Sequence, residues 1–244
     1  MEKLPYSIQY RVTSIQYLPR TTNNDQRTPP MFITFEGIEG SGKTTQIKLL
    51  IPVLQAKGYE CIATREPGAT EVGRNIRAIL LDSANTTMLP LTELLLYEAD
   101  RSQHVHEVIR PALTANKVVV SDRFFDATTV YQGYARGFDL KLIERIHRLV
   151  IGDLRPDLTV VLDLPVDLGL KRAWERINAQ SGDLPEDRFE KEAFAFHEKV
   201  RQGYLTLAGI EPERFRIIDA NRSYQVIQKE IAEIVLGFLD LKGG

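Results

Sequence analysis

Cysteine is almost missing from this chain of 244 residues, because Cys61 is the only one. A single thiol cannot close an intrachain disulfide, which excludes a disulfide scaffold. The chain also lacks a run of about 20 apolar residues, the length that crosses a bilayer. The residues near its N-terminus contain no apolar segment of the kind found in secretory signals. These absences predict a cytoplasmic protein with no membrane span.

An excess of either charge is missing too, since 31 lysines and arginines stand against 33 aspartates and glutamates. The formal net charge of -2 gives no general attraction to nucleic acid or to an anionic membrane, so neither is an expected partner. Any anion site must be built locally. The histidines follow no metal-binding spacing, and we expect them on the surface or in helix packing. They are His104, His106, His147 and His197.

Residues 1–30 differ from the rest of the chain. They are polar, and the run 21–30 has too little apolar surface to offset the entropy lost on ordering. We therefore expect 1–30 to be a disordered appendage and 31–244 to be the folded domain. Met31 opens a strand-like run directly, so an alternative is that Met31 is the true start of the protein.

From Met31 onward, short apolar runs alternate with longer segments of helical periodicity. The run 118–120 is apolar on both faces, which suits a parallel sheet buried under helices. The alternation predicts one doubly wound α/β domain, a five-stranded parallel sheet with helices on both faces and ligands at the carboxyl edge. Strands are expected at 31–35, 60–64, 117–122, 158–163 and 214–219, and helices at 43–57, 71–81, 91–115, 139–151, after Asp163 and at 224–241.

A phosphate-binding loop follows the first strand. Residues 37–44 match G-x-x-x-x-G-K-[ST] in full, with a strand before the motif and a helix after it. The glycines let backbone N–H groups approach phosphate oxygens. Lys43 would contact the β- and γ-phosphates of ATP, and Thr44 would contact Mg²⁺. The expected ATP-binding residues here are Gly37, Ile38, Glu39, Gly40, Ser41, Gly42, Lys43, Thr44 and Thr45.

Such a loop does not by itself distinguish a kinase from a GTPase switch. A switch would need the guanine-specifying sequence Asn-Lys-x-Asp after a late strand, and this chain lacks it. Arginines near the carboxyl ends of two strands, Arg65 and Arg123, favour a kinase, because two guanidinium groups can bind and neutralise one acceptor phosphate. For either arginine alone, a solvated salt bridge is the alternative.

With these motifs the chain resembles the bacterial thymidylate kinases, a family of P-loop nucleoside monophosphate kinases. The resemblance covers about 31–240 and leaves 1–30 outside. It implies ATP-dependent phosphorylation of thymidine monophosphate to the diphosphate for dTTP synthesis, with Mg²⁺ as cofactor, by a homodimer. The sequence leaves deoxyuridylate or another monophosphate open as the acceptor. The matching segments are 35–45, 64–68, 77–81, 122–124, 131–133 and 155–158.

The resemblance also implies roles for single residues on the acceptor side. Glu39 would approach the sugar 3′-hydroxyl. Arg77 and Arg123 would clamp the acceptor phosphate, with Arg65 in support. The remaining substrate-binding residues implied are Tyr97 and Arg101 for the base, Thr128 and Thr129 beside it, and Tyr131 against the sugar 2′ position. Phe124 departs from the family pattern, which usually has Tyr or His there, so a polar contact is expected to be lost.

The family divides by the position of a catalytic arginine, in the phosphate loop or in a mobile lid. Gly40 holds the loop position here, which places the chain in the lid-arginine subgroup with a lid at about 174–190. Arg176 is the first candidate and Arg188 the alternative. The expected catalytic residues are therefore Lys43, Glu39, Arg123 and Arg176, with Arg172 against the adenine, and Thr44, Asp122 and Glu66 around the metal.

Overall fold

The computed structural model describes residues 30–179 and 187–243. Most of the expected appendage at 1–30, and the part of the expected lid at 180–186, lie outside these residues. Among the helices of the described residues, none is both long and apolar enough to cross a membrane.

A five-stranded parallel sheet forms the centre of the domain, as the sequence predicts. Its order is β2-β3-β1-β4-β5, and the register sets Asp122 of β3 level with Phe35 of β1 and Arg65 of β2. The carboxyl ends of these three strands therefore meet at one edge. The strands are β1 (Met31–Glu36), β2 (Cys61–Arg65), β3 (Val118–Asp122), β4 (Leu158–Asp163) and β5 (Phe215–Asp219).

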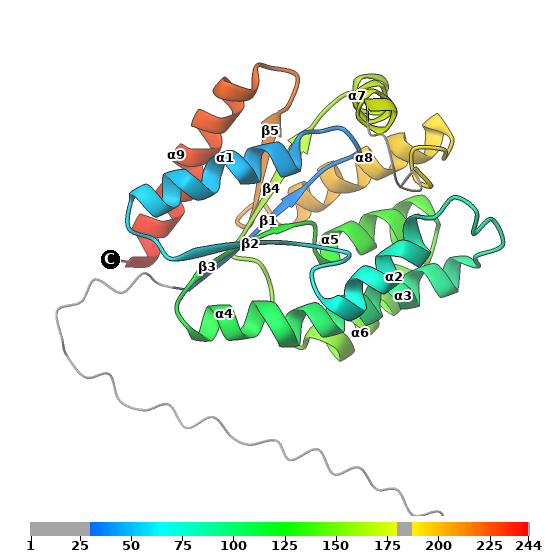
Figure 1. Cartoon of the computed structure of the whole chain (residues 1–244), viewed down its shortest axis with the longest axis horizontal. Helices are drawn as coiled ribbons and strands as arrows, with labels where there is room; N and C mark the ends of the chain where they lie inside the picture. The colour runs from blue at the N-terminus through cyan, green and yellow to red at the C-terminus, as the bar shows by residue number, and fades with distance from the viewer. Residues whose placement is uncertain (1–29, 180–186, 244) are drawn as a thin grey trace, which may run out of the picture.

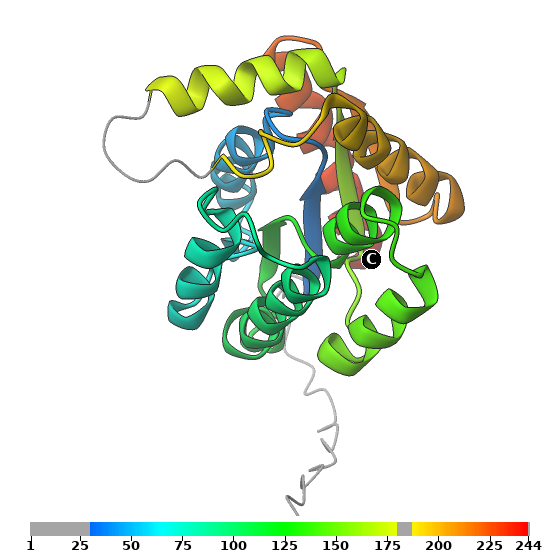
Figure 2. The same cartoon turned by 90° about the vertical axis from the view of Figure 1, so that its right-hand side faces the viewer.

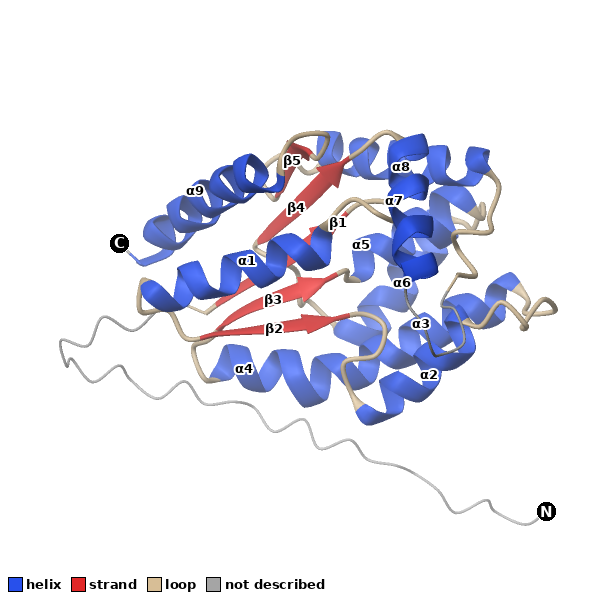
Figure 3. Ribbon diagram, turned by 45° about the horizontal axis from the view of Figure 1, so that its top comes forward, coloured by secondary structure: helices blue, strands red, loops and turns tan. Residues whose placement is uncertain are grey.

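Helices cover both faces of the sheet, which confirms the doubly wound fold. Figures 1 and 3 show α1 (Lys43–Ala56) and α9 (Tyr224–Gly243) on one side and α4 (Arg110–Thr114) on the other. The side chains of β1 alternate between the two layers, so that Ile33 and Phe35 belong to one apolar cluster and Phe32 to the other. The remaining helices include α2 (Glu71–Leu81), α3 (Pro90–His104), α5 (Phe125–Thr128), α6 (Leu140–Ile151) and α7 (Val166–Ala179).

The helix expected at 91–115 is interrupted. It consists of α3, a π-helical turn η1 (Val105–Ile109), and α4. Pro111 lies in the first turn of α4. Proline has no N–H to donate and its ring clashes with the preceding turn. The helical hydrogen-bond pattern therefore changes in the wider π-helical turn just before Pro111.

Two helical segments were not expected from the sequence, α8 (Phe194–Ile210) and the π-helical η2 (Thr129–Ala135). The apolar residues of α8 do recur at helical spacing, since Phe196, Val200, Tyr204 and Leu207 are all buried. Gly203 of α8 lies against η2, where an added Cβ would be 3.0 Å from Val130. These two helical segments pack together beside the carboxyl edge of the sheet.

Candidate active site

The loop between β1 and α1 is closely covered by α7, which crosses beside it in Figure 2. Gly40 has a φ of +69°, and an added Cβ would lie 2.0 Å from the carbonyl oxygen of Gly169 on α7. Both the backbone conformation and the contact exclude a larger residue. Position 40 therefore has no room for an arginine in this arrangement of α7.

Lys43 opens α1 and turns its ammonium group back into the loop. Its Nζ donates to the carbonyl oxygens of Gly37 (3.1 Å) and Ile38 (2.9 Å) and to Oγ of Ser41 (3.3 Å). Burial, together with the nearby Arg123, lowers the pKa of Lys43 to about 8. The loop's own oxygens thus hold the ammonium of Lys43 inside the loop, where it is the cation available to a bound phosphate.

Two side chains whose oxygens could bind a metal ion meet beside the loop, one at the start of α1 and one at the end of β3. The Thr44 hydroxyl donates to Oδ2 of Asp122 at 2.5 Å. Hydroxyl and carboxylate oxygens are ligands that Mg²⁺ accepts, so this pair fits the cofactor. Glu66 does not join it, because one of its oxygens accepts from Arg101 (2.9 Å) and the other lies 2.8 Å from Nδ1 of His104. The geometry gives no support to the expected metal role of Glu66.

Arg123 directly follows β3 and has a positive φ of 72°, unusual for a residue with a side chain. Hydrogen bonds on both sides hold this conformation: the Arg123 N–H donates to Phe35 O (3.0 Å), and the Phe124 N–H donates to Oε1 of Glu36 (2.8 Å). The backbone turn aims the guanidinium at the loop that follows β1.

The Arg123 side chain pairs with Glu39 and stacks on an aromatic ring. Its Nη2 donates to Oε1 of Glu39 at 3.0 Å, and its Cζ lies 4.9 Å from the centre of the Tyr131 ring. The Tyr131 hydroxyl donates to the same Glu39 oxygen at 2.5 Å. Three expected site residues, from the loop, β3 and η2, are therefore in direct contact.

Glu39 remains ionised in this setting. Burial by itself would raise the pKa of its carboxyl group. His197 at 3.2 Å, Arg123 and Lys43 outweigh burial, so the pKa lies well below its usual range. A carboxylate held among cations can accept a hydrogen bond from a sugar hydroxyl.

A second buried carboxyl group, Glu36, lies behind the arginine. The Tyr204 hydroxyl donates to Oε2 of Glu36 at 2.7 Å, and Nη1 of Arg123 donates to the same hydroxyl oxygen at 3.2 Å. Burial, with Asp126 nearby, raises the pKa of Glu36 to about 8. Glu36 and Tyr204 thus support Arg123 through both its backbone and its side chain.

Arg101, expected at the base, is fully buried in α3. It donates to Glu66 and Glu98, to Phe124 O (3.3 Å) and to the Thr128 hydroxyl (2.9 Å). These four bonds use most of its five N–H donors and fix the guanidinium rigidly. Thr128 therefore lies beside Arg101.

The structure gives Thr129 and Phe124 contacts outside this cluster. The Thr129 hydroxyl donates to Phe125 O (3.2 Å) and lies 3.2 Å from Nε2 of His147 on α6, so its hydroxyl contacts these groups and not the Arg101 guanidinium. Phe124 is fully buried against the Phe32 ring, with centroids 4.9 Å apart. The Phe124 ring therefore packs in the apolar core, where it offers no polar group for a contact at the site.

The other acceptor-side residues surround the same edge. Nη1 of Arg77 on α2 donates to Pro67 O (3.1 Å) in the segment that follows β2, and Arg65 is exposed at the end of that strand. Tyr97 is partly buried, and its ring lies 6.4 Å from the Phe189 ring. The two arginines thus lie next to the segment between β2 and α2.

The lid arginines differ in their contacts. Arg176, on α7, is 54% exposed and donates to Glu190 at 3.1 Å. Arg188 is 14% exposed, donates to Leu80 O (3.1 Å) and pairs with buried Glu93. Arg188 is therefore anchored to α2 and α3, whereas Arg176 is the more exposed of the two. Arg172 donates to Ala220 O (3.3 Å), just beyond β5.

Several residues that organise this site were not expected from the sequence. Tyr204 and His197 both come from the unexpected helix α8. Glu190 is a third such residue, because burial and the charge of Glu39 together raise its pKa. The histidines lie as expected, on the surface or in helix packing: His106 is exposed, and His104, His147 and His197 are buried on α3, α6 and α8. Each buried histidine lies within 3.2 Å of a glutamate, a pairing that sequence spacing does not reveal.

Comparison with known proteins agrees with this geometry. The thymidylate kinase family model matches residues 35–231. The thymidylate kinase of Desulfosudis oleivorans is 55% identical over 190 residues, 78% of this chain and 89% of that protein. That of Geotalea uraniireducens is 55% identical over 208 residues, 85% of this chain and 97% of that protein.

A solved structure gives the same result. The crystal structure of thymidylate kinase from Ehrlichia chaffeensis superposes with a TM-score of 0.67 at 33% identity, covering 84% of this chain and 98% of the other. The matches to these relatives cover most of the chain. The chain belongs to the thymidylate kinase family.

Proposed function

We propose that the protein transfers the γ-phosphoryl group of ATP to thymidine monophosphate at the cluster of Lys43, Glu39 and Arg123, and that the diphosphate supplies dTTP synthesis. Family membership makes the protein a nucleoside monophosphate kinase. The observation that carries the assignment of the site is the 3.0 Å ion pair between Arg123 and Glu39. Glu39 lies within the phosphate loop, so this ion pair joins the loop proposed to bind ATP to the arginine proposed to bind the monophosphate.

Transfer at such a site depends on positioning and on charge neutralisation. ATP would lie on 37–45, with Lys43 at its β- and γ-phosphates and Arg172 near the adenine. The acceptor phosphate is already an anion, so no strong general base is needed. Arg176 would supply a further cation to the γ-phosphoryl group, because position 40 has no room for one.

Thr44 and Asp122 would hold Mg²⁺, directly or through water. The ion would neutralise charge on the β- and γ-phosphates of ATP when it is bound. Their contact supports this assignment, because it places two oxygen donors beside the phosphate loop.

On the acceptor side, Arg123 and Arg77 would bind the monophosphate, with Arg65 in support. Glu39 would accept from the sugar 3′-hydroxyl. Tyr131 would crowd the 2′ position, since its hydroxyl is tied to Glu39 and its ring to Arg123. Tyr97, Arg101 and Thr128 would bind the base.

A panel of acceptors tests the substrate. With ATP and Mg²⁺, a coupled assay should show the highest kcat/KM for thymidine monophosphate, and lower values for deoxyuridine monophosphate and for ribonucleotides. Equal values for ribo- and deoxyribonucleotides would contradict the role of Tyr131. ATP turnover that no monophosphate stimulates would contradict the acceptor site as a whole.

We also propose that the protein is a cytoplasmic homodimer. Three neighbouring helices, α2, α3 and α6, carry exposed large apolar side chains, and an apolar surface of this kind suits a second copy of the chain. Sedimentation that returned the mass of one chain would contradict the dimer. The exposed residues are Val72, Ile79, Leu91, Leu95, Leu140, Leu142 and Leu149.

A chain that begins at Met31 should retain the fold and the activity. Met31 is fully buried in β1, so the domain proposed at 31–244 keeps its whole first strand. The melting temperature and kcat/KM of the shortened chain should equal those of the full chain. A clear fall in melting temperature would show that 1–30 contributes to the folded core or to an interface.

A further inference from the structure

His197 is a buried polar residue that the proposed mechanism leaves unused. It lies on α8, its side chain is 0% exposed, and its Nδ1 is 3.2 Å from Oε2 of Glu39. Within the described residues, neither ring nitrogen of His197 has a hydrogen bond of good geometry, and neither does this glutamate oxygen. Leaving such groups unpaired in a buried site is unfavourable, so the approach of Nδ1 to Oε2 indicates a hydrogen bond between them.

The neighbouring contacts explain why this oxygen matters. Oε1 of Glu39 already accepts from both Arg123 and Tyr131. These two donors fix one oxygen of the carboxylate, and the orientation of the group still depends on what holds the other. His197 is the side chain that faces it.

The surroundings favour donation from the ring to the carboxylate. Two bare lone pairs 3.2 Å apart would repel, so one group must carry the proton. Arg123 and Tyr131 both donate to Glu39, as they would to a carboxylate that only accepts, so the N–H between the two groups belongs to Nδ1 of His197. The edge of the ring packs against Phe196, with centroids 5.6 Å apart, so its position is constrained by the core.

We propose that His197 is a positioning residue that donates its Nδ1–H to Oε2 of Glu39 and so orients the carboxylate toward the 3′-hydroxyl of the acceptor sugar. The inference rests on the acceptor role proposed for Glu39. His197 touches no reacting atom and acts through Glu39 alone. It therefore affects the reaction only with acceptors that carry a 3′-hydroxyl.

A double-mutant cycle tests this role. His197→Phe keeps an aromatic ring but removes the donor, whereas His197→Asn keeps an N–H near the position of Nδ1. We expect His197→Phe to lower kcat/KM for thymidine monophosphate about 10-fold or more, the loss typical of a hydrogen bond to a charged group. His197→Asn should recover most of it. In a Glu39→Ala background, His197→Phe should have no further effect.

A second acceptor gives an independent reading. With 3′-deoxythymidine monophosphate, which lacks the hydroxyl, His197→Phe and the unaltered protein should have equal kcat/KM. A His197→Phe loss that persists in full with Glu39→Ala, or with this acceptor, would show that the histidine only packs in the core.

Two further outcomes separate the inference from the function on which it rests. If Glu39→Ala lowers kcat/KM but His197→Phe does not, the role of His197 is overturned and that of Glu39 stands. If Glu39→Ala itself has no effect, the acceptor role of Glu39 fails. Should His197→Phe not fold, nitrogen NMR of the unaltered protein decides the tautomer: a proton on Nδ1 supports the proposal, and a bare Nδ1 overturns it.

Discussion

Arg123→Ala should lower kcat/KM for thymidine monophosphate by about 1000-fold, or about 4 kcal/mol of transition-state stabilisation. The change removes the cation proposed to bind the acceptor phosphate and leaves the buried oxygens of Glu39 and Tyr204 without their charged partner. Alanine has a Cβ, as arginine does, so the strain of the φ of 72° is similar in both proteins. The difference in kcat/KM therefore measures the loss of the guanidinium group.

Steady-state kinetics and calorimetry with ATP check this expectation. The affinity for ATP should change little, because Lys43 and the loop remain. Arg123→Lys should recover only part of the activity, since an ammonium cannot bind two phosphate oxygens as a planar guanidinium does. Arg216→Ala, on β5 against the Phe238 ring, is a control that should leave kcat/KM unchanged. An equal loss of ATP affinity in Arg123→Ala would move Arg123 out of the acceptor site.

Arg176→Ala should lower kcat by about 100-fold with little change in KM for the monophosphate. The expected loss is large because charge develops on the γ-phosphoryl group during transfer, and the contact of Gly40 with Gly169 leaves no room for a cation on the loop itself. The monophosphate is held by Arg77 and Arg123, so its KM should not follow kcat.

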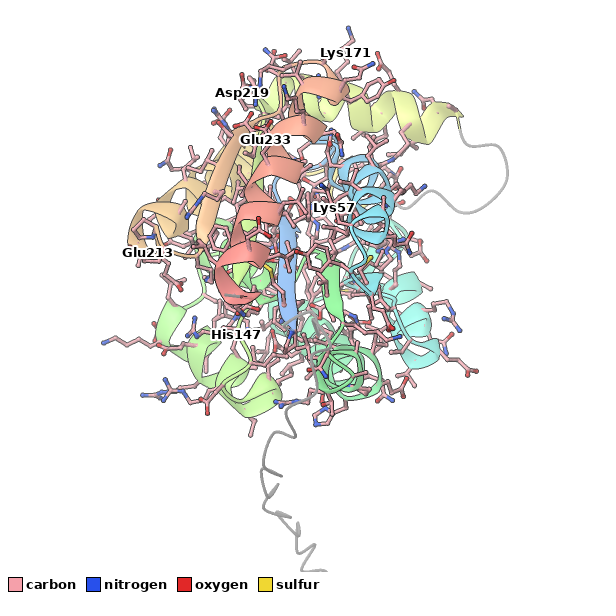
Figure 4. All side chains as sticks on the ribbon, turned by 90° about the vertical axis from the view of Figure 1, so that its left-hand side faces the viewer. Lys57, His147, Lys171, Glu213, Asp219 and Glu233 are labelled. Atoms are coloured by element: carbon pink, nitrogen blue, oxygen red, sulfur yellow. The ribbon has the colours of Figure 1, made fainter. Side chains whose placement is uncertain are left out.

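Two matched variants sharpen the test of Arg176. Lys171→Ala removes a cation that points outward from the same helix (Figure 4) and should leave kcat unchanged. Arg188→Ala should lower the melting temperature, because it leaves the buried Glu93 with one fewer partner, and it should lower kcat less than Arg176→Ala does. If Arg188→Ala instead gave the loss in kcat, the two arginines would exchange roles, and if neither did, no lid arginine would act.

The fold and the phosphate loop could be predicted from the sequence because their signals are local. Apolar runs such as 118–120 identify buried strands, and 37–44 combines glycines, a lysine and a threonine at fixed spacing between a strand and a helix. The strand bounds agree with the structure to within one residue at each end. The α8 helix was missed although its apolar spacing is regular, because the polar segment at 174–190 separates it from the strand–helix alternation that identifies the other elements.

Sequence by itself determined the parallel α/β architecture, the position of the phosphate loop and the set of arginines at the carboxyl edge of the sheet. Tertiary structure alone decided which partners these residues have. Tyr204 and Glu36 are 168 positions apart, yet they meet at 2.7 Å and support Arg123. Arg101 and Thr128 are 27 positions apart, yet a hydrogen bond of 2.9 Å joins them, whereas Thr129, the next residue, contacts His147 on α6. The physical reason is that periodicity specifies which face of an element is buried, whereas contacts between elements depend on strand register and helix packing across the whole chain.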